Sequence, residues 1–182
     1  MRKLLSLHPE SRSFAPAQQV EVEISRSRTD QLVLFYTLTG KMSDIRVPAV
    51  TRAARSDQLW RHTCFEAFVR TLSGEEYYEF NFAPSTQWAA YRFSSYRSGM
   101  SVAPKISTPS IEVRLKPDRL TLRATLELGH LMDLPDKTLW RVGLSALIED
   151  MNGRKSYWAL AHPPGKPDFH HADCFVYELP PP

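Results

Sequence analysis

The chain has no apolar run that approaches the roughly 20 residues of a membrane-spanning helix. Its first residues, MRKLLSLHPES, hold a short apolar run that Ser6, His8 and Pro9 interrupt, which is too short for the core of a secretory signal. We therefore expect a cytoplasmic protein with no membrane partner.

Cysteine is scarce. The 182 residues include only two, Cys64 and Cys174, and no C-x-x-C or other zinc-like spacing occurs. Both cysteines lie in apolar, strand-like surroundings, which predicts buried free thiols rather than a disulfide. Three histidines fall close together at His162, His170 and His171, but their spacing does not match a zinc pattern. We expect no bound metal, with a calcium ion between carboxylates as an alternative.

Strong charge of one sign is also missing. The formal net charge is +3 at pH 7, and the arginines are spread along the chain. A nucleic-acid-binding protein is expected to carry a concentrated basic stripe, so no nucleic-acid partner is predicted. The hydrophobic fraction of 42% and the charged fraction of 24% are typical of a soluble globular protein. We expect one domain over residues 1–182, in which residues 1–18 are irregular.

The signatures of several enzyme classes are absent. The chain holds no G-x-S-x-G, no phosphate-binding loop and no dinucleotide fingerprint. This absence favours a non-catalytic protein, but it does not exclude an enzyme built on paired carboxylates.

What the chain does contain is a series of short segments with alternating apolar residues, separated by turn residues. The expected strands are 20–24, 31–40, 63–71, 76–82, 87–93, 111–116, 120–128, 139–149, 155–161 and 174–179. No segment has the pattern of a long helix. The sequence therefore predicts an all-β fold, an antiparallel β-sandwich of about ten strands resembling immunoglobulin or jelly-roll domains, with a closed barrel as the alternative.

The stretch LWRHTCFEAFVRTLSGEEYYEFNFAPSTQWAAYRF, residues 59–93, reads as three consecutive antiparallel strands. Residues directly opposite each other in a ladder share a face. A turn at Ser73-Gly74 pairs Glu66 with Asn81 and Phe68 with Glu79. A four-residue connection at 83–86 then places Trp88 beside Asn81, and Arg92 beside Tyr77, on the same face.

This predicted face mixes carboxylates and an amide with aromatic rings, which is what a sugar-sized ligand needs. We expect hydrogen bonds to the ligand from Glu66, Glu79, Asn81 and Arg92. Trp88 and Tyr77 would stack on it. The alternative is that another part of the chain covers the face and that arginines pair with the two glutamates.

Two further segments complete the predicted site. Tyr96 and Arg97 follow the third strand, and Trp158 precedes a proline-rich loop over residues 162–173. Three prolines fix the backbone of that loop, which presents side chains for a rim around the pocket. The expected rim residues are His162, Lys166, Asp168 and His170.

Other functions remain open on the residues alone. Glu66 and Glu79 on adjacent strands would suit glycoside hydrolysis if their separation is suitable. A haem group would need an axial ligand such as Met100 together with His162 or His170. The polar face could also be the interface of a protein-interaction domain.

The runs LWRHTCFEAFVR, YYEFNFAPSTQWAAYRFSSYR and YWALAHPPGKPDFHHADCF resemble the bacterial DOMON-like proteins, and the resemblance spans roughly residues 32–179. These proteins are related to the DOMON superfamily and to the family-nine carbohydrate-binding modules. The resemblance implies a β-sandwich that binds sugar or haem. It marks Glu66, Glu79 and Asn81 as ligand-binding residues, whereas Trp88 and Trp158 do not match the aromatic clamp of the sugar-binding modules. No position clearly matches the Met and His of the haem branch.

Overall fold

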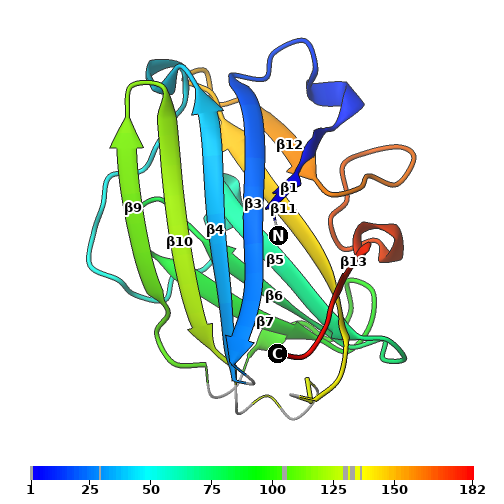
Figure 1. Ribbon diagram of the computed structural model, residues 1–182. Coiled ribbons are helices and arrows are strands. Elements are labelled where there is room, and N and C mark those ends of the chain that lie inside the picture. Colours follow the sequence, from blue (N-terminus) through cyan, green and yellow to red (C-terminus); the bar gives the residue numbers. More distant parts are fainter. Residues whose placement is uncertain (1, 29, 104–105, 129–130, 132–133, 136) are drawn as a thin grey trace.

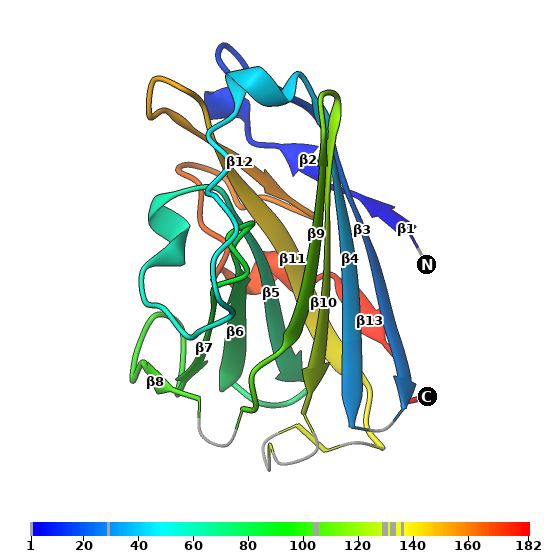
Figure 2. The same ribbon diagram turned by 90° about the vertical axis from the view of Figure 1, so that its left-hand side faces the viewer.

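The computed structural model describes residues 2–28, 30–103, 106–128, 131, 134–135 and 137–182, and it consists mainly of two antiparallel β-sheets packed face to face (Figures 1 and 2). Apolar residues at every second position give each sheet a face to bury, which is why the sheets pack together. The predicted β-sandwich is confirmed. The described strands number thirteen rather than about ten, because several edge strands are only two or three residues long.

The first sheet has five strands. Their order across the sheet is β1 (Arg2–Leu4), β3 (Ala17–Arg28), β4 (Gln31–Gly40), β10 (Arg119–Glu127) and β9 (Ser110–Lys116). Burial alternates along β4, so that Leu32, Leu34, Tyr36 and Leu38 point into the sandwich.

The second sheet has eight strands. Seven follow the order β2 (Ser6–Leu7), β12 (Lys155–Ala159), β11 (Trp140–Glu149), β5 (Cys64–Thr71), β6 (Tyr77–Phe82), β7 (Trp88–Phe93) and β8 (Ser101–Val102). The eighth, β13 (Tyr177–Leu179), pairs with one end of β11. Short 3-10 turns complete the described elements: η1 (Pro9–Ser11), η2 (Met42–Asp44), η3 (Leu59–Arg61) and η4 (Ala172–Cys174). No helix in the described part of the chain is long and apolar enough to cross a membrane.

The N-terminal segment corrects one expectation. Residues 1–18 were expected to be irregular, but β1 pairs with β3, and β2 pairs with β12. Leu5, between the two strands, is buried in the core. The segment thus crosses from one sheet to the other, and its short strands each add to an edge of a sheet.

The first hairpin of residues 59–93 forms as predicted. Glu66 lies opposite Asn81, and Phe68 lies opposite Glu79. Phe65, Ala67 and Val69 alternate with them and enter the core between the sheets. This register places both glutamates on the outer face of the second sheet.

The second hairpin differs from the prediction by one residue. Thr86 adopts a left-handed conformation (φ 70°), and the amide of Ala83 donates to the carbonyl of Gln87 at 2.9 Å. The connection therefore holds five residues, and Trp88 pairs with Phe82. A shift of one residue exchanges the two faces of a strand. The predicted placement of Trp88 and Arg92 beside the glutamates is wrong, and Ala89, Tyr91 and Phe93 occupy that face instead.

Strands β5 and β6 are buried on both faces, which a solvent-facing sheet would not be. The outer face of the second sheet carries a second apolar cluster, to which η3 contributes Leu59 and the C-terminal loop contributes Phe169 and Phe175. Figure 2 shows residues 46–62, cyan to teal, on the side of this sheet away from the first. The site described below lies under this covering layer.

Candidate functional site

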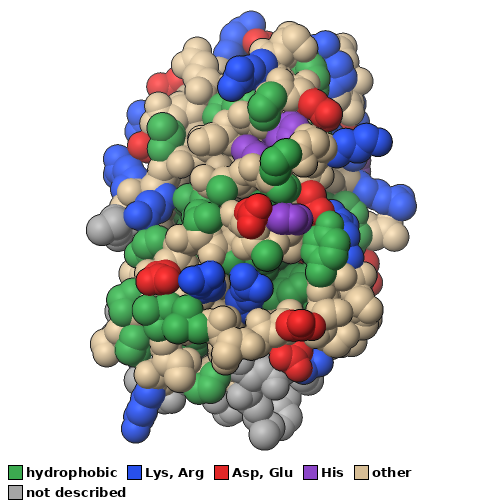
Figure 3. Space-filling model, turned by 90° about the vertical axis from the view of Figure 1, so that its right-hand side faces the viewer, with side chains coloured by type: hydrophobic (Ala, Val, Ile, Leu, Met, Phe, Trp, Pro, Cys, Tyr) green, Lys and Arg blue, Asp and Glu red, His purple; other side chains and the backbone are tan. Residues whose placement is uncertain are grey.

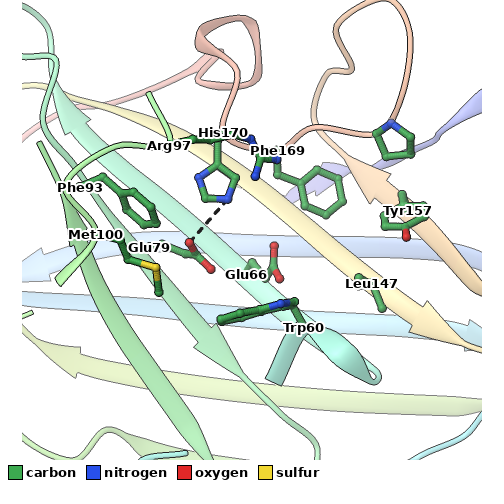
Figure 4. Close-up of a pocket in the computed structure, with 11 residues that line it drawn as sticks. Trp60, Glu66, Glu79, Phe93, Arg97, Met100, Leu147, Tyr157, Phe169 and His170 are labelled. Carbon is green, nitrogen blue, oxygen red and sulfur yellow. Dashed lines mark ion pairs between the residues drawn. The ribbon is translucent and has the colours of Figure 1, made fainter. Parts of the chain in front are cut away.

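A cavity of about 360 Å³ lies over the outer face of the second sheet, under the covering loops (Figure 4). Strands β5, β6, β7, β11 and β12 form its floor, and η3 and the loops after β7 and β12 form its walls. Its lining residues are Trp60, Glu66, Glu79, Phe93, Arg97, Met100, Leu147, Tyr157, Pro167, Phe169 and His170.

Two carboxyl groups occupy the floor. Glu66 and Glu79 are only 3% and 5% exposed, and each is anchored by one oxygen. Ser145 donates its hydroxyl to Oε2 of Glu66 at 3.2 Å, and Asn81 donates its side-chain amide to Oε1 of Glu79 at 2.7 Å. Asn81 does not line the cavity. It fixes the orientation of Glu79 from behind.

Both carboxyl groups are unusually weak acids. Burial and, to a smaller extent, the charge of the neighbouring Glu79 together raise the pKa of Glu66 to about 8. Burial also raises the pKa of Glu79 to about 7, against the hydrogen bond from Asn81 and the charge of Arg97. The two groups titrate as a pair, so near neutral pH they share protons rather than carry two full charges.

His170 faces Glu79 across the cavity, where the dashed line in Figure 4 joins its Nε2 to Oε2 of Glu79 at 3.7 Å. Burial, with a smaller contribution from Arg97, lowers the pKa of His170 to about 4. The ring is therefore neutral at neutral pH, and this contact is no ion pair there. At 3.7 Å it is also too long for a hydrogen bond, so both atoms remain available to a ligand in the cavity.

The loop after β7 and the C-terminal loop are joined by a polar cluster at the cavity rim. Arg97 donates from Nε and Nη2 to Oδ1 of Asp168 at 3.2 and 2.8 Å, and Tyr96 donates its hydroxyl to Oδ2. The amide of His170 also donates to Oδ1 of Asp168, at 3.0 Å. Asp168 thus positions both Arg97 and His170, and this pairing holds the pKa of Asp168 below its ordinary value despite partial burial.

Four aromatic rings line the cavity: Trp60, Phe93, Tyr157 and Phe169. Trp60 packs edge-on against Tyr91, with ring centres 5.8 Å apart, and the Tyr91 hydroxyl donates to Asp57 at 2.6 Å. Figure 4 shows the indole of Trp60 as a flat surface beneath Glu66. Trp60 is half-buried, so part of its face stays available to a ligand.

The sequence predicted four of the lining residues, which are Glu66, Glu79, Arg97 and His170. Tyr77, Asn81, Tyr96 and Asp168 lie behind these groups and hold them in place. The Tyr77 hydroxyl lies 2.8 Å from Nδ1 of His170.

The other predicted residues lie away from the cavity. Trp88 and Trp158 are buried in the core between the sheets, and Arg92 lies opposite Tyr78 on that side, 3.8 Å from Glu76. His162 bonds the carbonyl of Ser6 at 2.8 Å, which ties its loop to β2. Lys166 is exposed at the tip of the loop. On this side of the molecule, basic, acidic and histidine side chains are interspersed without a large patch of one charge (Figure 3). Trp158 fails to reach the site because it lies opposite Ala146 on the inward face of β11 and β12.

The sequence prediction missed most of the apolar lining, including Trp60, Phe93, Tyr157 and Phe169. One signal was present for Phe93. With the connection one residue longer, Ala89, Tyr91 and Phe93 move to the face of the glutamates. The position of Trp60 depends on the path of residues 46–62 over the sheet, which has no periodic pattern to read.

Both cysteines are buried and free, as predicted. Cys64 donates its thiol to Oδ1 of Asn81 at 3.6 Å, and Cys174 to the carbonyl of Asp168 at 3.2 Å. Across the described ranges, no group of three or more His, Cys, Asp or Glu side chains is placed to hold a metal ion.

Comparison with known proteins gives the fold only. No protein-family model and no curated protein matches the chain. Among solved structures, a candidate carbohydrate-binding protein of Bacteroides uniformis matches with a TM-score of 0.74 at 12% identity, over 99% of this chain and 85% of that one.

A family-nine carbohydrate-binding module of Caldicellulosiruptor kristjanssonii, in complex with glucose, matches with a TM-score of 0.54 at 13% identity, over 93% and 80% of the two chains. A structure of such a module from the same organism, in complex with cellotriose, matches with a TM-score of 0.51 at 12% identity, over 91% and 74%. The chain therefore shares the β-sandwich fold of these carbohydrate-binding modules.

Proposed function

We propose that the protein binds a small saccharide, without catalysis, in the cavity above Glu66 and Glu79. The observation that carries this proposal is the make-up of the cavity, which combines buried polar groups with four aromatic rings. Sugars present hydroxyl groups at their edges and apolar C–H surfaces on their faces, and this lining matches both. The volume of about 360 Å³ lies at the small end of the range of roughly 300–1,000 Å³ for ligand pockets.

The side chains divide into two roles. Glu66, Glu79 and the Nε2–H of His170 would hydrogen-bond sugar hydroxyls, with Arg97 at the rim. Trp60 replaces Trp88 as the stacking residue, because its indole lines the cavity and Trp88 is in the core. Both fold neighbours from Caldicellulosiruptor kristjanssonii are sugar complexes, and the sequence resemblance to DOMON-like proteins points to the same kind of ligand.

The test is isothermal titration calorimetry of the purified chain with glucose, cellotriose and a panel of other small saccharides, with and without calcium. We expect binding of at least one saccharide, and a loss of at least tenfold in affinity in Glu79→Gln. Lys166→Ala is the matched control, because Lys166 is charged, exposed and outside the cavity. Absence of binding to every saccharide, or equal losses in both variants, would contradict the proposal.

A second candidate function is glycoside hydrolysis, which the raised pKa values of the carboxyl pair favour. A carboxyl group that stays protonated near neutral pH can act as a general acid, and its ionised neighbour can act as a base or nucleophile. Release of product from chromogenic glycosides, lost in Glu66→Gln, would support this function. Binding without product release would leave the non-catalytic function in place.

Haem fits the cavity poorly. Met100 and His170 both line it, and both residue types can serve as axial ligands of haem. However, Nδ1 of His170 is bonded to Tyr77, and Nε2 faces Glu79 at 3.7 Å. Nδ1 is therefore closed to an iron atom, and Nε2 could bind one only if the ring hydrogen were on Nδ1 and Glu79 moved away.

A further inference from the structure

The cavity has more acidic than basic groups facing it. Glu66 and Glu79 are the two acids among its lining residues, and Arg97 is the one lining residue with a permanent positive charge. The guanidinium of Arg97 is already paired with Asp168 through two nitrogen atoms. His170 is neutral because its pKa is lowered to about 4. Within the described residues, the carboxyl pair therefore forms no ion pair with Lys or Arg, and the charge of Arg97 acts on it only from a distance.

Each carboxyl group also has one oxygen that is available to accept a hydrogen bond from a ligand. Ser145 and Asn81 occupy one oxygen of each group, as described above. No described residue donates a hydrogen bond to Oε1 of Glu66, although the residue as a whole is buried. In Figure 4 the carboxyl group of Glu66 points into the space between Trp60 and Phe169. This oxygen is not enclosed by protein: it borders the cavity, where it can accept a hydrogen bond from a ligand.

Aromatic rings surround that space. The faces of Trp, Tyr and Phe rings attract a cation, and the attraction grows when the cation is removed from water. Trp60, Tyr157 and Phe169 line the cavity together with the two carboxyl groups. Aromatic rings and acidic side chains in one cavity suit a bound ammonium group, whereas a neutral hydroxyl group does not require more acidic than basic groups around it.

We propose that the ligand of this cavity carries a protonated amine, which lies between Glu66 and Glu79 and against the surrounding rings. This inference rests on the proposed saccharide site, and the ligand class it names is an amino sugar with a free amine. The amine donates to the open carboxyl oxygens, and the remainder of the sugar ring contacts Trp60.

Binding of such a ligand displaces a proton. Near neutral pH the free carboxyl pair retains protons, and a cation beside it favours the doubly ionised form. The nearby weak acids Cys64, Tyr77 and Tyr157 have raised pKa values and stay protonated, while Arg97 and Asp168 stay charged. The carboxyl pair is therefore the source of the released proton.

The experiment compares five probes by isothermal titration calorimetry at pH 7: D-glucosamine, D-glucose, N-acetyl-D-glucosamine, cyclohexylamine and cyclohexanol. We expect glucosamine to bind at least tenfold more tightly than glucose and N-acetylglucosamine, and cyclohexylamine to bind more tightly than cyclohexanol. Titrations in phosphate and Tris buffers, which differ in ionisation enthalpy, should show proton release with glucosamine and none with glucose. This measurement uses the unaltered protein and does not depend on a variant that folds.

The outcomes separate the two proposals. If glucose binds as tightly as glucosamine, or if no proton is released, the proposal of an amine on the ligand is wrong and the proposed saccharide site is unaffected. Cyclohexylamine binding with no sugar bound would support the amine and overturn the saccharide. If none of the five probes binds, the amine proposal is wrong, and the wider saccharide panel described above decides the saccharide site. In Glu66→Gln and Glu79→Gln the preference for glucosamine over glucose should fall below threefold, and an unchanged preference would overturn the role given to the pair.

Discussion

The hydroxyl of Tyr77 lies 2.8 Å from Nδ1 of His170, and this contact fixes which ring nitrogen faces the cavity. The Tyr77 oxygen accepts the amide hydrogen of Arg97 at 3.2 Å, so its own hydrogen is free to be donated to Nδ1. A neutral imidazole that accepts at Nδ1 carries its hydrogen on Nε2. In this tautomer the Nε2–H group faces Glu79 and is available as a donor for a ligand.

Tyr77→Phe tests this arrangement. The substitution keeps the ring stacked on Phe93, with centres 4.7 Å apart, and removes only the hydroxyl. We expect a loss of about 1–3 kcal/mol in the free energy of unfolding, because two partners lose a hydrogen bond. Saccharide affinity should fall about fivefold or more as His170 loses its orientation.

Urea unfolding and calorimetric titration measure these two effects. Tyr96→Phe is the control, because the Tyr96 hydroxyl bonds Asp168 on an exposed part of the rim. Its unfolding free energy should change by less than about 0.5 kcal/mol. Equal changes in both variants would show that Tyr77 has no special role in the site.

The two tryptophans Trp60 and Trp88 separate binding from stability. Trp60→Ala should weaken saccharide binding at least tenfold, because it removes the stacking surface. Trp88→Ala should destabilise the fold by about 3–5 kcal/mol, because Trp88 fills the core between the sheets. Thermal unfolding and titration of both variants decide the matter. Strong destabilisation by Trp60→Ala, with binding retained, would contradict the site.

Trp88 was predicted on the wrong face of its sheet because of a single backbone conformation. The pattern of apolar residues fixed the register of β5 and β6 correctly, since Ser73-Gly74 marks their turn and Glu66 pairs with Asn81. The next connection depends on the left-handed conformation of Thr86, which a non-glycine residue adopts rarely. No local pattern signals it, and the next strand is displaced by one residue.

The segments that cover the second sheet could not be predicted from local sequence patterns, for a different reason. Trp60 and Phe169 reach the cavity from segments that are far apart in the sequence and have no strand periodicity. Their positions follow from long-range packing, such as the bonds of Asp168 to Arg97. The sequence did predict the carboxyl pair, because residues on regular strands follow the period of two.

The raised pKa values of Glu66 and Glu79 predict that stability falls with rising pH. In the unfolded chain these groups ionise near pH 4.5, whereas in the folded protein they ionise near pH 8 and pH 7. Between these limits the folded state binds more protons than the unfolded state, so their contribution to the free energy of unfolding decreases as pH rises. Below pH 4.5 both states are protonated and the contribution is constant.

Glu66→Gln should remove part of this dependence. We expect a higher midpoint of unfolding than the unaltered protein at pH 8, and a similar midpoint at pH 4.5, measured by urea unfolding across that range. Comparison with the variant removes the effect of His170, whose lowered pKa acts in the opposite direction by reducing stability below about pH 6.5. A pH dependence of stability that is the same in both proteins would contradict the raised pKa of Glu66.

Asp168→Ala should loosen the rim. The substitution removes the carboxylate that holds Arg97, Tyr96 and the amide of His170. We expect faster amide exchange in residues 94–99 and 166–171 and weaker saccharide binding, with exchange in β5 and β6 unchanged. Hydrogen exchange with mass spectrometry measures both. Unchanged exchange in the two rim segments would show that Asp168 does not tie them together.

The most direct measurement is a titration of the ¹⁵N-labelled protein with glucose, cellotriose and glucosamine, followed through the indole N–H signals of its four tryptophans. Trp60 lines the cavity, whereas Trp88, Trp140 and Trp158 lie in the core between the sheets. If the sugar binds in the cavity, we expect a saturable shift of the Trp60 signal, with the other three signals nearly unchanged. No shift with any of these sugars, or a shift confined to Trp88 or Trp158, would contradict it.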